Sequence, residues 1–145
     1  MTLPPNPDTS RSSGSPDSLV AVALVHVVGG RLLAVRTRGR DRFYLPGGKP
    51  EPGETLAEAV RREVREEIDA VLDDAELAFV VEDEAHGFSR PTRVRLTCFT
   101  GSLTGDPRPA NEIAELAWLS WADRHRAAPA VQQVLSRTVG PLGGG

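Results

Sequence analysis

The chain has 145 residues, and its 17 basic and 20 acidic side chains give a formal net charge of −3. A chain of this length forms one domain with its own core, and its slight acidic excess argues against a surface for nucleic acid polymers. The longest apolar run, residues 19–28, is too short to span a bilayer, and no signal-peptide pattern precedes it. We therefore expect a soluble, cytoplasmic protein with no membrane partner. Its single cysteine, Cys98, cannot form an internal disulfide and is expected to be packed in a strand.

The N-terminal part predicts a tail followed by a hairpin. Residues 1–18 are rich in Pro, Ser, Asn and Asp and are expected to be disordered. Residues 19–28 are too uniformly apolar for a half-exposed strand and predict one buried strand. Gly29 and Gly30 then predict a two-residue turn into a second strand at 31–36. We expect His26 to be a packed or edge-facing histidine rather than a catalytic one.

A basic loop at 37–42 leads to the glycine pair Gly47 and Gly48. Arginine suits bidentate phosphate contact, and glycine lets the backbone approach a ligand closely. One or more arginines of this region are candidates for phosphate binding, with a solvated loop as the alternative: Arg36, Arg38, Arg40 and Arg42. Phe43 or Tyr44 is either a base-stacking residue or a core or rim aromatic. No Gly-Lys-Ser/Thr arrangement follows, which excludes a P-loop.

Residues 56–68 predict an amphipathic helix. Thr55 can cap its start, with Glu58 as the capping-box partner. An apolar stripe repeats every four residues: Leu56, Val60, Val64 and Ile68. At about 100° per residue, Glu63 and Glu67 fall inside this apolar arc and Glu66 flanks it.

These three acids need compensation if they approach the protein interior. Burying an uncompensated carboxylate costs several kcal/mol, so either raised pKa values or a bound cation must relieve the repulsion. Hard carboxylate oxygens on one rigid face suit Mg²⁺, which takes one or two protein carboxylates together with water and phosphate oxygens. The alternative is a solvated helix held by Glu–Arg pairs.

The remaining chain predicts strands and short helices in alternation. Strands are expected at 77–81, 92–100 and 116–119, and polar or Gly/Pro-rich segments around Asp73-Asp74, at 82–89 (with His86) and at 101–110. Ser120 should cap a helical turn ending near Arg126, and a last helix should start at Pro129 and close at Gly140. A flexible tail is expected at 140–145. This order predicts a mixed sheet between helices.

The spacing Gly48, five residues, Glu54, seven residues, then Arg62-Glu63-Val64-Arg65-Glu66-Glu67 resembles the Nudix box. One position departs: Asp69 stands where that family usually has glycine, and Asp tolerates the left-handed end of a helix. The resemblance to the Nudix hydrolases implies an α/β/α sandwich with a mixed sheet over residues 19–139. Family relatives are often homodimers, so the resemblance is also compatible with a homodimer.

The resemblance further implies the roles of single residues. Mg²⁺, for which Mn²⁺ can substitute, would be held by Glu63, Glu66, Glu67 and the Gly48 carbonyl, with Arg62 and Glu54 orienting the acids. The general base is either a box glutamate or a loop acid, and Glu112 is preferred over Glu115 among the loop acids. The substrate-binding candidates are Arg36, Arg38, Arg42, Tyr44, Gly47 and Gly48.

The expected reaction is metal-dependent hydrolysis of a nucleoside diphosphate linked to another group. The opening FYLPGGKPEPGE looks most like that of nucleoside triphosphate pyrophosphohydrolases, including those that clear oxidised nucleotides. We expect an NTP or dNTP to be cut to a monophosphate and pyrophosphate. ADP-ribose or a nucleotide sugar is the alternative substrate, and a non-catalytic nucleotide sensor is the alternative from another class.

Overall fold

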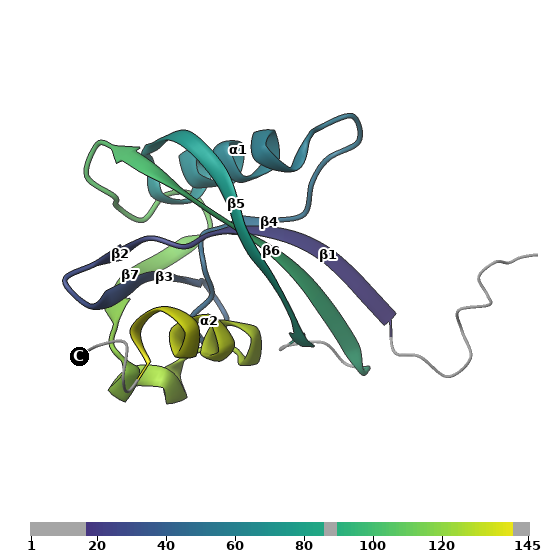
Figure 1. The fold of residues 1–145 in the computed structure, drawn as a ribbon, viewed down its shortest axis with the longest axis vertical. Coiled ribbons are helices and arrows are strands. Elements are labelled where there is room, and N and C mark those ends of the chain that lie inside the picture. Colours follow the sequence, from purple (N-terminus) through teal and green to yellow (C-terminus); the bar gives the residue numbers. More distant parts are fainter. Residues whose placement is uncertain (1–16, 86–89, 141–145) are drawn as a thin grey trace, which may run out of the picture.

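Two β-sheets lie between two helices in the computed structural model, which describes residues 17–85 and 90–140 (Figure 1). The first sheet is mixed, with strand order β4-β1-β6-β5, and the second is antiparallel, with order β2-β3-β7. The strands are β1 (Asp17–Leu24), β2 (Val27–Val28), β3 (Arg31–Thr37), β4 (Gly47–Gly48), β5 (Val71–Glu84), β6 (Thr92–Thr104) and β7 (Ile113–Leu119). The helices are α1 (Leu56–Ile68), the 3₁₀ helix η3 (Trp121–Arg126) and α2 (Pro129–Val139).

The second half of strand β1, from Val22 to Leu24, is buried on both faces, which explains why its sequence is uniformly apolar. Val22 and Leu24 pack with α1 in one core, whereas Ala23 and Val25 pack with α2 in the other. The same alternation occurs in β3. Because side chains alternate across a strand, the two helices must cover opposite faces of the sheets (Figure 1). The α/β/α sandwich with a mixed sheet is confirmed, but a second, antiparallel sheet accompanies the mixed one.

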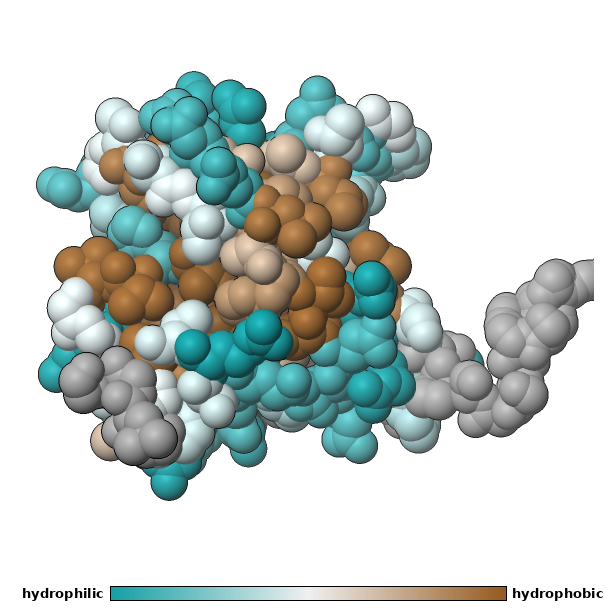
Figure 2. All heavy atoms as spheres, in the orientation of Figure 1, coloured by the Kyte–Doolittle hydropathy of each residue, from teal (hydrophilic) through white to brown (hydrophobic). Residues whose placement is uncertain are grey.

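The single strand predicted at 19–28 is wrong in its bounds. Strand β1 begins at Asp17, inside the predicted tail, and ends at Leu24; β2 is a separate strand that pairs with β3 across Gly29 and Gly30. The chain therefore crosses from one sheet to the other at Val25 and His26. Strand β2 is an edge strand, so its valines are exposed despite their apolar character. In Figure 2, hydrophobic surface gathers at the left over this hairpin.

Strands β5, β6 and β7 are longer than predicted. The turn predicted at Asp73-Asp74 is instead a bulge within β5, where Asp74 has a φ of 55°. Strand β5 continues through residues 82–84, which were predicted to be loop, and β6 continues to Thr104. Strand β7 likewise starts earlier than predicted, at residue 113. Pairing with β6 gives β5 a ladder of backbone hydrogen bonds along one side, and it overrides the local turn signals.

Helix α1 has the predicted bounds and start. The Thr55 hydroxyl accepts a hydrogen bond from the Glu58 N–H (3.1 Å), and the Glu58 carboxylate accepts one from the Thr55 N–H (2.9 Å). Asp69 ends the helix in the left-handed region, with a φ of 53°. Leu56 was predicted to begin the buried stripe, but it is exposed; the packed stripe begins one turn later, at Ala59 and Val60.

The C-terminal helices confirm their predicted starts. Ser120 precedes η3, and its N–H and hydroxyl both donate to the Asp123 carboxylate. Helix α2 starts at Pro129, and Gly140 follows its last residue. The predicted states of residues 1–16, 141–145 and His86 lie outside the described residues. Within the described ranges, no helix is long and apolar enough to cross a membrane.

Candidate active site

The glycine pair of β4 forms a floor against which helix α1 can place its acids. Gly47 and Gly48 pair with Ala23 and Val22 of β1. A Cβ on Gly47 would overlap the Val22 carbonyl oxygen, and a Cβ on Gly48 would lie 2.7 Å from the Cδ of Glu63. Of these two positions, only at Gly47 does backbone block a side chain; at Gly48 a side chain would displace the end of the flexible Glu63 side chain instead.

Glu67 is the most deeply placed acid of α1, with only 7 % of its surface exposed. Its Oε1 accepts a hydrogen bond from the Gly47 N–H at 3.1 Å. Burial raises the pKa of Glu67 to about 9, and the nearby carboxyl groups of Glu63 and Glu112 add to this rise against the opposing effect of the Gly47 hydrogen bond. The position therefore favours a neutralised carboxyl, whether by a proton or by a cation.

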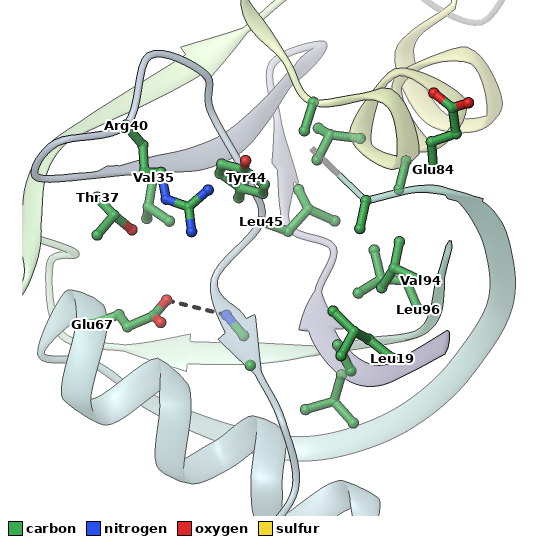
Figure 3. Close-up of a pocket in the computed structure, with 18 residues that line it drawn as sticks. Leu19, Val35, Thr37, Arg40, Tyr44, Leu45, Glu67, Glu84, Val94 and Leu96 are labelled. Atoms are coloured by element: carbon green, nitrogen blue, oxygen red, sulfur yellow. Dashed lines mark hydrogen bonds between the residues drawn. The ribbon is translucent and has the colours of Figure 1, made fainter. Parts of the chain in front are cut away.

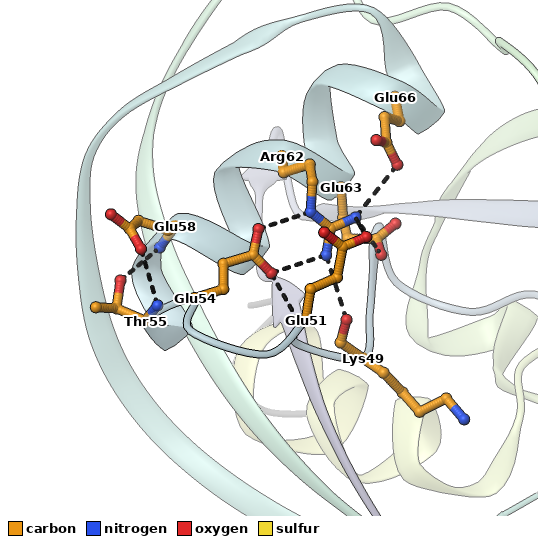
Figure 4. A network of polar contacts seen from close by, with 8 residues as sticks. All are labelled: Lys49, Glu51, Glu54, Thr55, Glu58, Arg62, Glu63 and Glu66. Atoms are coloured by element: carbon orange, nitrogen blue, oxygen red, sulfur yellow. Dashed lines mark hydrogen bonds and ion pairs between the residues drawn. The ribbon is translucent and has the colours of Figure 1, made fainter.

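Arg62 connects the acids of α1 to the loop before the helix (Figure 4). Its Nε and Nη2 donate to Oε2 and Oε1 of Glu54 at 2.7 and 3.0 Å, and its Nη1 donates to Glu63 at 3.1 Å and to Glu66 at 3.3 Å. Nη2 also donates to the Lys49 carbonyl oxygen at 3.3 Å. These contacts lower the pKa of Glu54 to about 2, chiefly through the Arg62 hydrogen bonds. Arg62 thus orients Glu63 from a position that Glu54 fixes.

The residues fit a divalent cation, and Glu63 and Glu67 are the two acids placed beside the glycine floor. Within the part of the chain that the structure describes, no three acidic, histidine or cysteine side chains converge into a ready-made metal cage. Glu63 and Glu67 lie beside the glycine floor, whereas the Glu66 side chain is half-exposed and turned towards Arg62. Mg²⁺ binds through one or two carboxylates with water and substrate phosphates, so Glu63 and Glu67 are sufficient as a start. The raised pKa of Glu67 has the same cause that would favour a cation there.

A pocket of about 290 Å³ opens above this floor (Figure 3). Its polar end contains Glu67, Arg40, Thr37 and the glycine pair, and Figure 3 shows the Arg40 guanidinium pointing into the space between Glu67 and Tyr44. Its other end is lined by apolar side chains from β1, β6 and α2: Leu19, Ala21, Val94, Leu96, Ala130 and Val131. The pocket can therefore hold an anionic group at one end and an apolar group at the other.

The four candidate arginines are placed differently. Arg36 donates to Glu115 at 2.7 Å and to the Arg40 carbonyl oxygen, Arg38 donates to the Asn111 carbonyl oxygen, and Arg42 donates to the Ala127 carbonyl oxygen. Only Arg40 of the four lines the described pocket. No feature of the sequence singles out Arg40, because all four arginines share one short basic segment. Tyr44 lines the pocket as well, whereas Phe43 is a core residue.

The two loop acids also differ. Glu115 pairs with Arg36, whereas Glu112 lies close enough to Glu67 to raise its pKa. Of the two, Glu112 is therefore better placed to act near the pocket. The sequence did not reveal Asn111, which joins the Glu112 segment to α1 through a hydrogen bond from its side chain to the Glu66 carbonyl oxygen (2.6 Å). Its only sequence signal is an asparagine in a Gly/Pro-rich loop, a type that adopts left-handed backbone readily.

Known proteins resemble the chain over most of its length. A family model described as NUDIX domain matches residues 17–137. The solved structure of a MutT protein from Methanosarcina mazei Go1 superposes with a TM-score of 0.68 at 24% identity, covering 86% of this chain and 95% of that one. Together, the sandwich fold and the acidic helix above a glycine floor define the Nudix class of hydrolases.

Two curated relatives complete the comparison. An isopentenyl-diphosphate Delta-isomerase of Cutibacterium acnes is 27% identical over 146 aligned positions, which cover 88% of this chain and 72% of the isomerase. The mouse 8-oxo-dGDP phosphatase NUDT18 is 46% identical over 43 residues, which cover 30% of this chain and only 13% of that longer protein. Since the family model matches most of the chain, the chain belongs to the Nudix family.

Proposed function

We propose that this protein hydrolyses a nucleoside triphosphate, ribo- or deoxyribo- and including oxidised bases, to a monophosphate and pyrophosphate. One observation supports this above the others: the buried Glu67 faces the glycine floor of a pocket that also contains the Arg40 guanidinium. A buried acid whose surroundings favour a cation therefore shares the pocket with a guanidinium that can bind an anion. A polyphosphate with its divalent metal satisfies both.

The chain's own groups would bind and align the polyphosphate. Arg40 supplies a planar donor for phosphate oxygens, and the glycine pair lets the backbone approach without side-chain obstruction. A divalent cation, Mg²⁺ or Mn²⁺, bound by Glu63 and Glu67 would supply charge neutralisation and make the attacking water more acidic. Arg62 and Glu54 hold Glu63 in place for that role.

The hydrolytic step adds one water across the anhydride. Its oxygen forms a bond to one phosphorus, the bond from that phosphorus to the bridging oxygen breaks, and pyrophosphate leaves with the bridging oxygen. Glu112 is our candidate to accept the proton of the water, because its carboxyl group is close enough to raise the pKa of Glu67. Phosphoanhydrides need alignment and charge neutralisation more than covalent catalysis, which suits a site built from acids, an arginine and exposed backbone.

A substrate panel with Mg²⁺ and phosphate detection tests the proposal. The panel contains NTPs, dNTPs, oxidised dGTP, ADP-ribose, NADH, dinucleoside polyphosphates and nucleotide sugars. We expect a triphosphate to be the best substrate, Glu67→Gln to lose at least 100-fold in kcat, and the matched surface variant Glu76→Gln to retain wild-type activity. Preference for ADP-ribose or a nucleotide sugar would overturn the choice of substrate, and nucleotide binding without hydrolysis would indicate a sensor.

A second candidate is a diphosphate that carries an apolar group in place of a nucleoside. The aliphatic end of the pocket favours it, because Leu19, Val94, Leu96 and Val131 provide contact area but no hydrogen bonds from their side chains. The similarity to an isopentenyl-diphosphate isomerase gives a concrete probe, so isopentenyl diphosphate belongs in the same panel. Turnover of this compound above every nucleotide would replace the first candidate with the second.

A further inference from the structure

The loop at residues 105–112 closes the C-terminal end of α1. The last carbonyl groups of a helix have no partner within the helix. Here three consecutive ones accept hydrogen bonds from this loop: the Glu66 carbonyl from the Asn111 side chain (2.6 Å), and the carbonyls of Glu67 and Ile68 from the N–H groups of Ala110 and Arg108 (3.0 Å each). The loop is therefore fastened to the very turn of α1 that carries Glu67.

The same loop also holds the basic segment at 37–42. The Arg38 guanidinium donates to the Asn111 carbonyl oxygen at 2.5 Å, and the Arg38 N–H donates to the Glu112 carbonyl oxygen at 2.9 Å. Two residues further on, the Arg40 N–H donates to the Thr37 carbonyl oxygen, which folds this segment into a tight turn. Arg40 is thus held on one side by the turn that Arg38 anchors to Asn111 and Glu112, and on the other by Arg36, which donates to its carbonyl oxygen.

Asn111 is where these two connections meet. Its side chain binds α1, its carbonyl oxygen binds Arg38, and the next residue is Glu112. Its φ of 52° lies in the left-handed region, which asparagine tolerates better than most residues. Glycine would supply the backbone conformation without the donor, and aspartate would supply an acceptor where the Glu66 carbonyl needs a donor. Asparagine meets both requirements.

We propose that Asn111 is a positioning residue, which fixes Glu112 and the Arg40 segment relative to Glu67 and so sets the geometry of the pocket's polar end. It acts through these neighbours and not on the substrate. The proposal rests on the proposed hydrolysis for its kinetic consequence, but its structural consequence is independent of any substrate.

The experiment compares Asn111→Gly with Arg108→Ala. The glycine variant keeps the left-handed backbone and removes only the amide donor, so it is expected to fold. The Arg108 variant removes a loop contact to the same helix end, the exposed ion pair with Asp69, but leaves Asn111 intact. Arg38→Met breaks the connection from the other side and serves as a second variant.

We expect Asn111→Gly and Arg38→Met to lower kcat/KM about tenfold, since small misplacements of reacting groups are costly in rate. Arg108→Ala should stay within twofold of wild type. Independently of activity, hydrogen exchange of the Arg38 amide should become at least tenfold faster in Asn111→Gly and stay unchanged in Arg108→Ala. Unchanged exchange in Asn111→Gly overturns the proposal, as does an equal kinetic loss in Arg108→Ala. A wild-type enzyme inactive on the whole panel would reject the proposed function while the exchange measurement still decides the role of Asn111.

Discussion

The guanidinium of Arg62 forms a two-point contact with the carboxylate of Glu54, through Nε–Oε2 at 2.7 Å and Nη2–Oε1 at 3.0 Å. The remaining nitrogen, Nη1, is left to hold Glu63 and Glu66. The planar guanidinium group of Arg62 can donate to Glu54 on one side and to Glu63 and Glu66 on the other, whereas the ammonium group of a lysine cannot do both. The contact therefore links the loop before α1 to the acids that we expect to bind metal.

Replacing Arg62 with lysine should consequently damage activity more than stability. We expect Arg62→Lys to reduce kcat about tenfold and to raise the Mg²⁺ concentration needed for half-maximal rate, because Glu63 loses its fixed donor while the positive charge remains. Steady-state kinetics across a Mg²⁺ titration measure both effects. The control is Arg61→Lys at the exposed neighbouring position. Equal kinetics for the two lysine variants would contradict the orienting role of Arg62.

The Glu54–Arg62 pair also predicts a defined pH dependence of stability. The pKa of Glu54 falls from 4.5 to about 2 in the folded protein, so the folded state favours the charged carboxylate. Its contribution is fully present above pH 4.5 and is lost as the pH falls towards 2. The difference in Tm between wild type and Glu54→Gln should therefore be constant from pH 8 to about pH 5 and should close below that, as measured by thermal melts followed by circular dichroism. A difference that already closes at neutral pH would show that this ion pair does not cause it.

The two glycines of β4 should respond differently to the same substitution. At Gly47 the added Cβ meets the backbone of Val22, which cannot move without disturbing β1, so Gly47→Ala should lower the free energy of unfolding by about 1–3 kcal/mol. At Gly48 the Cβ meets the end of the Glu63 side chain, which can rotate away. Gly48→Ala should therefore remain nearly as stable as wild type but lose about tenfold or more in kcat, because Glu63 leaves its place. Chemical denaturation and kinetics on both variants test the pair, and the opposite ranking in stability would contradict it.

Cys98 should be unreactive in the folded protein. It is fully buried in the α2-side core, and burial raises the pKa of its thiol to about 12, so the reactive thiolate is scarce at pH 8. We expect a thiol-reactive dye to label Cys98 only at the rate of unfolding and to label it at once in guanidinium chloride. Rapid stoichiometric labelling without denaturant would show that this core opens on its own.

The sequence predicted those parts of the fold that local interactions determine. The Thr55–Glu58 capping box and the left-handed Asp69 arise from neighbouring residues, and both are as expected. Strand β4 has no such signal: two glycines have little preference for strand, and only their pairing with β1 makes them one. Likewise, the sequence around Asp74 predicts a turn, and only the pairing of β5 with β6 makes this segment a bulge within a strand. Long-range pairing is the information that single residues do not carry.

The candidate site, like the fold, could be predicted from the sequence only in part. Glu63 and Glu67 were expected on the inner side of α1 from helical geometry, and the structure places them beside the glycine floor. The sequence could not show that Arg40 lines the pocket while the other three arginines do not, or that Glu112 lies nearer to Glu67 than Glu115 does. Both differences depend on partners far away in the chain, such as the pairing of Arg36 with Glu115. The assignment of metal ligands, base and phosphate-binding residues stays a prediction for the experiments above.

Strand β1 carries none of the candidate groups, yet its register determines where the glycine floor and helix α1 lie relative to each other. Its odd and even positions point to opposite helices, and its residues 22 and 23 hold the β4 glycines in place. Inserting one residue before Val22 would exchange the two sets of side chains between the layers and move the glycine floor out of step with α1. A change of length in this strand should therefore abolish catalysis although every candidate side chain is still present, and variation among relatives should be confined here to substitutions of similar size.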